Sequence, residues 1–416
     1  MLKTSNAHLT FLYRATKIFG LAPFALKNNM AVEGSAPDVL YPFFAAIFYL
    51  LSGIALSYVR LSANFSVNDR LSITTDVLTE QIGTVAVVAV ILTNRSKRDV
   101  IVDVFNSFVE IDRILATLNI RQDYPGLFRT RARRFGYFYC LISMAENQLS
   151  IASWIFNDAI TARHFLIILV SGNGMYFVFH LVLFLFANIM ELITERCEQL
   201  NDALSALCSV ERSRTPNSTR LNVADVGAVG FGRSEALERL KRIQELHHRV
   251  TELIDKTVDL FSLPVLATVG FYFANLVTLS FGIYMFTEVV WMAGTAVLWM
   301  IPLVLELYAV AVVSASVQNS VRRSPKILNG VWIKHRPHDL QNEIQMLSLQ
   351  MLQTPVVVSA FGFFPLDYSI LYTMFCTVVG YILIMIQFDN SRRDPAAKIK
   401  IRQSAWHRIL PNYRAD

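Results

Sequence analysis

Seven long apolar runs set the limits on what this chain can fold into. They cover residues 41–59, 72–93, 135–156, 165–190, 260–286, 289–317 and 368–388, and a run of about 20 mostly apolar residues is long enough to cross a bilayer as a helix. Of the 416 residues, 54% are hydrophobic and 17% are charged, a balance that soluble globular chains rarely have. The sequence therefore predicts an all-α membrane protein with seven transmembrane helices.

The placement of lysine and arginine predicts the orientation of these spans. Cationic flanks are retained on the cytoplasmic side, and with a cytoplasmic N-terminus the outer loops hold only Arg60, Arg70 and Arg163. We therefore expect the N-terminus inside, with the first span serving as an uncleaved insertion signal. The sequon at Asn64 would lie in the first outer loop, where it is open to glycosylation. The basic tail after Phe388 would lie outside, against the rule.

The stretch before the last span has a different character. Residues 341–360 carry a single charge, Glu343, and intersperse glutamines among leucines and methionines. This pattern predicts an amphipathic inner helix that packs on protein rather than crossing the membrane. Pro355 and the Gly362/Pro365 pair are expected to break that helix before the last span begins. The segments 94–134 and 191–256 are expected to continue the neighbouring spans as helices into the cytoplasm.

The C-terminal region resembles the signature region of insect gustatory receptors over about fifty residues. In order, it contains Leu347-Ser348-Leu349-Gln350-Met351, then Gly362-Phe363-Phe364-Pro365-Leu366-Asp367, then Gly380-Tyr381-Ile382-Leu383-Ile384-Met385-Ile386-Gln387-Phe388. The last stretch is similar to the family's hallmark of Thr-Tyr, five hydrophobic residues and Gln-Phe. Gly380 stands in place of the threonine, so this position has no hydroxyl group.

The resemblance implies a ligand-gated, poorly selective cation channel in the plasma membrane of a sensory neuron. It implies a homo- or hetero-tetramer of gustatory receptor subunits and a small-molecule tastant bound in the outer half of the bundle. The corresponding division of the chain is residues 1–40 as a cytoplasmic N-terminal segment, 41–317 as a ligand-binding bundle of six helices, 318–365 as a cytoplasmic loop and anchor helix, 366–388 as the pore-lining helix, and 389–416 as a basic tail. No cofactor is implied.

Helical spacing assigns two faces to the end of the last span. Tyr381, Ile384 or Met385, and Phe388 lie about one turn apart on one face, whereas Gln387 falls near Leu383 and Gly380 on another. A ring of apolar residues can gate by dewetting, and a polar ring can help conduction. These five residues, Tyr381, Ile384, Met385, Gln387 and Phe388, are the pore and gate candidates. The alternative is that Tyr381 and Gln387 form hydrogen bonds between helices.

Polar and aromatic residues within the spans are candidates for the ligand site, because ionisable groups in hydrocarbon usually face a cavity or each other. The candidates are Asp76, Glu80, Glu146, Asn147, Asn173, Tyr176, Asn275, Trp291 and Trp299, with Glu306 deeper in the sixth span. Carboxylates and amides bind hydroxyl groups and an indole stacks on a sugar ring, so the set favours a sugar-like polyol. The alternative is that its members only join helices by hydrogen bonds.

Other features predict no further chemistry. His247 and His248 are adjacent on a helix and therefore point about 100° apart, which is unsuited to a shared metal. His180 is expected to be a hydrogen-bonded interior histidine. The basic runs at 129–134 and 239–242 are best explained as topology determinants in contact with anionic membrane lipid, rather than as nucleic-acid sites. The sequence has no phosphate loop, catalytic triad or paired-carboxylate pattern, so we expect no enzyme.

Three alternatives to a self-sufficient taste receptor remain. The first is an insect odorant receptor-type channel subunit, which the Tyr381 to Phe388 ending disfavours. The second is a bitter-responsive gustatory receptor that needs co-receptors. The third is a metabotropic receptor or a secondary transporter; the expected cytoplasmic N-terminus argues against a G-protein-coupled receptor, and the lack of an inverted internal repeat argues against a transporter.

Overall fold

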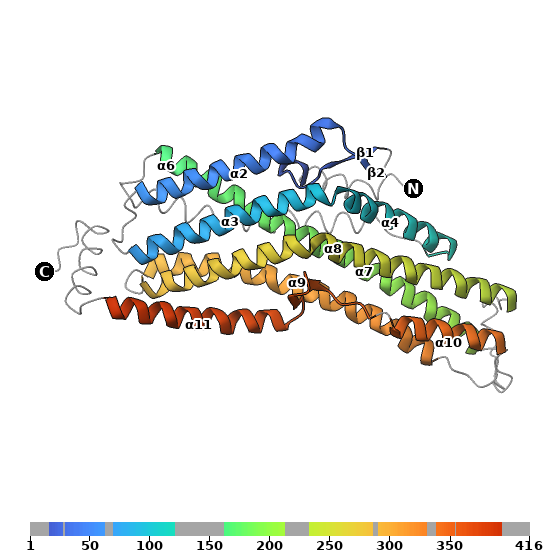
Figure 1. The fold of residues 1–416 in the computed structure, drawn as a ribbon. Coiled ribbons are helices and arrows are strands. Elements are labelled where there is room, and N and C mark those ends of the chain that lie inside the picture. The colour runs from blue at the N-terminus through green and yellow to red at the C-terminus, as the bar shows by residue number, and fades with distance from the viewer. Residues whose placement is uncertain are drawn as a thin grey trace.

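The computed structural model describes residues 16–27, 30–62, 70–120, 162–212, 233–285, 290–330, 338–353 and 355–392. Its long helices lie side by side in an elongated bundle (Figure 1). They are α2 (Ala36–Ser62), α3 (Arg70–Ser96), α4 (Arg98–Thr117), α6 (Ala162–Ile167), α7 (Asn173–Arg212), α8 (Arg233–Met285), α9 (Val290–Gly330), α10 (His338–Gln353) and α11 (Ser369–Arg392). A π-helical turn, η1 (Ile168–Gly172), joins α6 to α7.

Six helices of the described part are long and apolar enough to cross a membrane. The apolar stretches are Ala36–Leu61, Ile73–Ser96, Val170–Ala206, Leu237–Met285, Ala293–Asn329 and Ser369–Phe388. They confirm six of the seven predicted spans, and the predicted span 135–156 lies outside the described residues. The chain leaves α4 at one end of the bundle and returns as α6 at the other end (Figure 1). The protein therefore has an all-α membrane fold.

Three helices are much longer than a bilayer is thick. α8 has 53 residues, about 80 Å at 1.5 Å per residue, whereas the hydrocarbon layer is about 30 Å thick. α7 and α9 have 40 and 41 residues, and all three extend toward the end of the bundle where α4 and α10 lie (Figure 1). We call this the inner end and the opposite end the outer end. The predicted helical extensions of the fourth and fifth spans are confirmed.

The amphipathic helix α4 is held against α7 and α8 at the inner end. Its apolar face is buried through Ile101, Val104, Phe108, Ile111 and Leu115. Its polar flanks form ion pairs across the helices. Asp112 pairs with Arg196 of α7 at 3.1 Å, and Asp103 lies 3.8 Å from Lys256 of α8. The Asp103–Lys256 pair is partly exposed and stabilises little by itself. The Arg196 side chain is only 2% exposed, so Asp112 compensates a buried charge.

The predicted amphipathic helix 341–360 is shorter than expected. α10 ends at Gln353, and the chain then forms two short strands, β3 (Ser359–Ala360) and β4 (Phe364–Pro365), that pair antiparallel. Their turn has positive φ angles at Phe361 and Gly362, a conformation that glycine adopts readily. A second hairpin, β1 (Phe24–Lys27) and β2 (Met30–Glu33), precedes α2. The apolar pattern predicts neither hairpin, because strands of only two to four residues are too short to show a periodicity.

The last helix, α11, is attached to the bundle by one face. Ile370, Met374 and Val378 are buried, their four-residue spacing puts them on one side of the helix, and α11 packs on α8 and α9. Asp367 caps its first turn by accepting hydrogen bonds from the backbone N–H and hydroxyl of Ser369, at 2.8 and 2.5 Å. These bonds lower the pKa of the Asp367 carboxyl below its ordinary value, so the cap is ionised at neutral pH.

Close packing of α3 on α7 and α8 requires a glycine. A Cβ atom at Gly83 would lie 2.5 Å from Phe271 Cε2 and 2.7 Å from Met175 Sδ. Gly270 of α8 has open space around it, with nothing within 4 Å of an added Cβ. Both glycines lie inside membrane helices, but an added methyl group would collide with neighbouring side chains at Gly83 and would have free space at Gly270.

We expect Gly83→Ala to destabilise the protein by about 1–3 kcal/mol, because overpacking displaces neighbouring side chains. The measurement is the thermal unfolding midpoint of the purified protein in detergent. Gly270→Ala is the matched control and should be neutral or slightly stabilising, because alanine favours the helix. Equal midpoints for the two variants would contradict this account of the α3 packing.

Candidate functional site

Polar side chains of five helices gather in the outer half of the bundle, around α3 and α7. They form three connected groups. One joins α2 to α3, one joins α7 to α8 and α9 through aromatic rings, and one lies a helical turn further inward. Four of the predicted ligand residues, Glu80, Tyr176, Asn275 and Trp299, make contacts within these groups, although they lie in four different helices.

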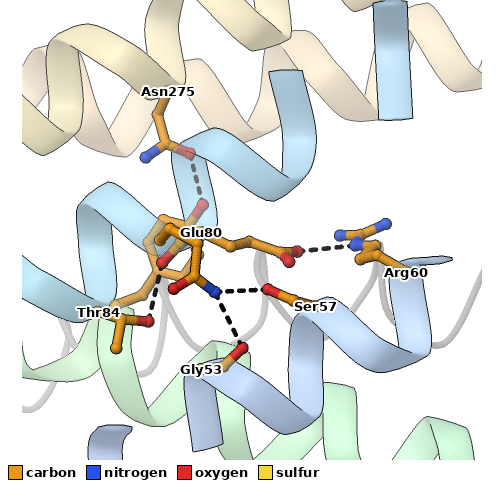
Figure 2. A network of polar contacts seen from close by, with 8 residues as sticks. Gly53, Ser57, Arg60, Glu80, Thr84 and Asn275 are labelled. Carbon is orange, nitrogen blue, oxygen red and sulfur yellow. Dashed lines mark hydrogen bonds and ion pairs between the residues drawn. The ribbon is translucent and has the colours of Figure 1, made fainter. Parts of the chain in front are cut away.

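An ion pair joins α2 to α3 in the first group. Arg60 Nε donates to Glu80 Oε1 at 2.7 Å, and Asp76, one turn from Glu80, also attracts Arg60 electrostatically. Figure 2 shows Arg60 on one side of this network and Asn275 of α8 on the other. Because a charged side chain in hydrocarbon is costly without a partner, the two carboxylates explain why Arg60 is tolerated at the end of α2.

Side-chain amides and hydroxyls extend this contact along α3. Gln81 Nε2 donates to Ser57 Oγ at 2.5 Å and to the Gly53 carbonyl at 3.3 Å, both on α2 (Figure 2). On the other side of α3, the hydroxyls of Thr79 and Thr278 of α8 share a hydrogen bond of 2.8 Å. These bonds hold α3 between α2 and α8 at the depth of the ion pair.

The second group centres on Tyr176 of α7. Its hydroxyl donates to Asn275 Oδ1 at 2.5 Å, and its ring contacts Trp299 of α9 edge to face, with centroids 4.7 Å apart. Phe271 lies against the same ring at 5.1 Å. Tyr176 also interacts electrostatically with Arg60, which connects this group to the first. The result is an aromatic surface flanked by an amide, a phenol and an indole.

The third group is a buried triad one turn inward. Tyr272 Oη of α8 lies 2.8 Å from His180 Nδ1 of α7 and donates to Glu306 Oε2 of α9. His180 Nδ1 is also 2.8 Å from Glu306 Oε1. His180 and Glu306 are only 1% and 3% exposed. The prediction that His180 is a hydrogen-bonded interior histidine is confirmed, and the triad ties three helices together at one level.

Two buried polar atoms of these groups have no hydrogen-bond partner or ion-pair contact among the described residues. They are Glu80 Oε2 and Trp299 Nε1. Buried polar groups are nearly always hydrogen-bonded, and exceptions call for an explanation. One acceptor and one donor that lack partners are suited to a ligand that carries hydroxyl groups. Among the described residues, no group of three His, Cys, Asp or Glu side chains is arranged to hold a metal ion.

The other predicted ligand residues differ in where they lie and in whether the structure describes them. Asn173 is half-buried three residues before Tyr176, at the point where η1 passes into α7. Trp291 lies in the first turn of α9, and its side chain is not described. Glu146 and Asn147 lie outside the described residues. π-Helical turns occur often at functional sites, and η1 is directly followed by the helix that carries Tyr176.

Sequence reasoning missed two residues that organise the site. The charge pattern places Arg60 in an outer loop, and Tyr272 gives no signal because it is one more aromatic residue in an apolar helix. A cation directly after the end of a span, with two carboxylates in the first part of the next span, is the pattern that points to the Arg60 pair.

The pore and gate candidates lie along the exposed part of α11. Tyr381 is half-exposed and packs edge-on against Phe273 of α8 at 5.6 Å. Ile384 and Phe388 are exposed and Met385 is half-buried. Gln387 is nine residues beyond the buried Val378, which at 100° per residue puts it on the opposite side of the helix. Gly380, Leu383 and Gln387 thus face away from α8, as the spacing predicts.

Comparison with known proteins identifies relatives over most of the chain. A family model described as 7tm Chemosensory receptor matches residues 9–391. A similar protein is the gustatory and pheromone receptor 39a, isoform D, of Drosophila melanogaster, which is 31% identical over 106 residues. That alignment covers 25% of this chain and 27% of the Drosophila protein, so it spans about a quarter of the relative's length.

Two solved structures share the fold. The insect olfactory receptor OR5 from Machilis hrabei in complex with eugenol superimposes with a TM-score of 0.61 and 14% identity, over 91% of this chain and 97% of that one. A second structure of OR5 from Machilis hrabei superimposes with a TM-score of 0.60 and 14% identity, over 91% of this chain and 97% of that one. At this identity the likeness concerns the fold alone.

We expect Tyr272→Phe to destabilise the protein by about 1–3 kcal/mol, because the change leaves buried polar groups of His180 and Glu306 without their shared partner. The thermal unfolding midpoint in detergent measures this. Tyr58→Phe, at an exposed position of α2, is the control and should leave the midpoint unchanged. A Tyr272→Phe midpoint equal to that of the native protein would show that the triad does not hold the helices together.

Proposed function

Since this chain belongs to the 7tm chemosensory receptor family, as an insect receptor of gustatory or odorant type, we propose that it is a tastant-gated, non-selective cation channel. The protein is a multi-pass membrane receptor and not an enzyme. The proposed location is the plasma membrane of a sensory neuron, with the N-terminus in the cytoplasm, and the proposed assembly is a homo- or hetero-tetramer with gustatory receptor subunits.

The observation that carries the channel proposal is the one-sided attachment of α11. Its buried residues Ile370, Met374 and Val378 lie on α8 and α9, and its other side carries the small or polar residues Thr373, Cys376, Gly380 and Gln387. Polar side chains in hydrocarbon usually face a cavity or a partner, so an exposed side of this composition suits a pathway or a second subunit better than lipid. Copies of α11 around a common axis would turn this side toward a central pathway.

Within this proposal, the outer part of α11 forms the narrow region. Ile384 and Phe388 would supply apolar side chains that can close a pathway by dewetting, and Gln387 would supply a polar ring. Met385 and Tyr381, which lie closer to α8, would link the motion of α8 to the pathway. Residues 318–365 would form the inner anchor, and 366–388 the pore-lining segment.

The proposed ligand is a sugar-like polyol bound in the bundle of residues 41–317. Hydroxyl groups can donate to Glu80 Oε2 and accept from Trp299 Nε1, the two buried atoms that lack described partners. The rings of Tyr176 and Trp299 offer apolar surface for a sugar ring. Asp76, Asn173, Asn275, Trp291, Glu146 and Asn147 complete the proposed site.

Two other ligand classes have specific support. The fold similarity to an olfactory receptor solved with eugenol favours a small aromatic odorant as a second candidate. The partial similarity to a gustatory and pheromone receptor favours contact chemoreception, and a bitter compound acting through a receptor with co-receptor subunits is compatible with it. The aromatic surface around Tyr176 suits either class.

The test is whole-cell current from cells that express this chain alone, with G-protein signalling blocked. A panel of sugars, bitter compounds and small aromatic odorants is applied. We expect a rapid cation current with at least one sugar. A current with bitter compounds or odorants alone would keep the channel proposal and reject the polyol. A second-messenger response without current, despite confirmed surface expression, would reject the channel.

We expect Gln387→Glu to increase the selectivity for cations over anions, and to shift the reversal potential accordingly. The reason is that the change adds a negative charge to each subunit at the proposed polar ring. Gln387→Leu should lower the conductance several-fold. Both are measured from current–voltage relations under defined ionic gradients. Gln353→Leu, an exposed amide at the end of α10, is the control. Unchanged reversal potential and conductance in both Gln387 variants would exclude this residue from the pathway.

A further inference from the structure

A cavity of about 60 Å³ lies in the inner half of the bundle, separate from the polar groups described above. Its walls come from the N-terminal segment 16–24, the corner between α3 and α4, and the helices α7 and α8, which meet below the β1–β2 hairpin in Figure 1. Most wall residues are fully buried, among them Phe24, Val104 and Val182 at 2%, 1% and 1% exposure. The cavity is therefore lined mainly by buried side chains.

The chemistry of the walls defines what can occupy the cavity. Apart from Thr16, Asn94 and Asn188, the lining side chains that the structure describes are apolar. Asn188 Nδ2 donates to the Phe184 carbonyl at 2.8 Å, and Asn94 Nδ2 donates to the Leu21 carbonyl at 3.4 Å, so both amides already have partners. Apolar cavities of this kind stay free of water and bind apolar guests instead. An occupant needs no charge and no hydrogen-bonding group.

The volume of the cavity limits the size of the molecule that can occupy it. An engineered apolar cavity of about 150 Å³ binds benzene or xenon, and drug-sized ligands occupy about 300–1,000 Å³. The cavity here is much smaller, so it suits a single xenon atom or an uncharged molecule of a few carbon atoms. An acyl chain of a membrane lipid is too large, which leaves a small free molecule as the occupant.

The cavity lies beside the proline of α8. Pro264 lines it together with Leu260, and because proline has no N–H, Pro264 cannot donate to the Leu260 carbonyl four residues earlier. Such a missing bond is a common cause of a helix kink. Two turns further along, α8 carries Tyr272 of the triad and Phe273, which contacts Tyr381 of α11. A guest beside Pro264 would therefore act on the helix that connects the outer site with α11.

A short segment covers the cavity. Leu21, Ala22 and Phe24 are 3%, 5% and 2% exposed, and the turn before them has Gly20 at φ +76° with Leu21 N–H donating to the Thr16 carbonyl at 2.9 Å. The segment is tied to the start of α2 by a Lys17–Asp38 ion pair of 2.7 Å. Displacement of this short cover would admit a small molecule without separating the helices.

We propose that this cavity is a second ligand site, for small uncharged apolar molecules, and that its occupation modulates the response to the ligand of the outer site. The binding half of the proposal is independent of the channel function, whereas the modulation rests on the function proposed above. The two ligands would not compete, because the cavity shares none of its lining residues with the three polar groups.

The binding experiment uses the purified full chain in nanodiscs and xenon as the probe, with the ¹²⁹Xe chemical shift measured against xenon pressure. We expect saturable binding to the native protein. Val104→Leu combined with Val182→Leu adds two methylene groups to the cavity and should weaken xenon binding at least tenfold. Val178→Leu makes the same change one turn away on α7, outside the cavity, and should retain it. Absence of saturable binding, or equal binding in all three proteins, overturns the proposal.

An enlarged cavity gives a test that does not depend on the filled variant folding. Ile189→Ala removes wall volume and should admit benzene, detected as a rise in the thermal unfolding midpoint with benzene concentration. The native protein should show at least a tenfold weaker benzene effect. A benzene response that is equal in the two proteins overturns the assignment of the site.

The functional experiment applies xenon-saturated buffer during ligand-evoked current. We expect xenon to change the maximal current of the native protein and of Val178→Leu, with less effect on the filled double variant. Xenon binding that leaves the current of the native channel unchanged overturns the modulatory half alone. Failure of every ligand to evoke current counts against the proposed channel, and the xenon and benzene binding results then decide the site by themselves.

Discussion

The membrane requires every polar side chain within it to find a partner, and the outer half of this bundle is arranged around that requirement. Arg60 of α2 is paired with Glu80 of α3, and Tyr272 joins α7, α8 and α9 through His180 and Glu306. Between apolar helices in lipid there is little hydrophobic force, so packing and such bonds decide which helices associate. These few contacts therefore select the neighbours and the register of the helices.

α8 is the helix on which the other parts depend. It contacts α3, α4, α7, α9 and α11, carries Tyr272 and Asn275 of the polar groups, and borders the inner cavity at Pro264. A change in the direction of α8 at Pro264 would displace two sets of α8 residues together, those in the outer polar groups and those that contact α11. The close approach of α3 at Gly83 and the hydrogen bond between Thr79 and Thr278 hold the part of α8 beyond Pro264 against α3.

α11 differs from the other membrane helices in how little of it the bundle covers. Its exposed side contains both large apolar residues, such as Tyr372 and Phe375, and the polar Gln387. This mixture suits a helix that meets lipid on one edge and a polar pathway or another subunit on the other. The Asp367 cap and the β3–β4 hairpin fix where the helix begins, which sets the depth of Gln387 relative to the bundle.

The amino-acid sequence by itself determined which segments are membrane helices, since hydropathy is a local property and 20 apolar residues can satisfy their backbone in lipid only as a helix. It also determined the C-terminal motif and the separation of Gln387 from the buried face of α11, which follows from the helical repeat. Tertiary structure decided that Arg60 pairs with Glu80, that Tyr272 completes the His180 and Glu306 triad, that the 341–360 helix stops at Gln353, and that a cavity remains beside Pro264. These features depend on the rotation and tilt of one helix against another, which no local pattern specifies.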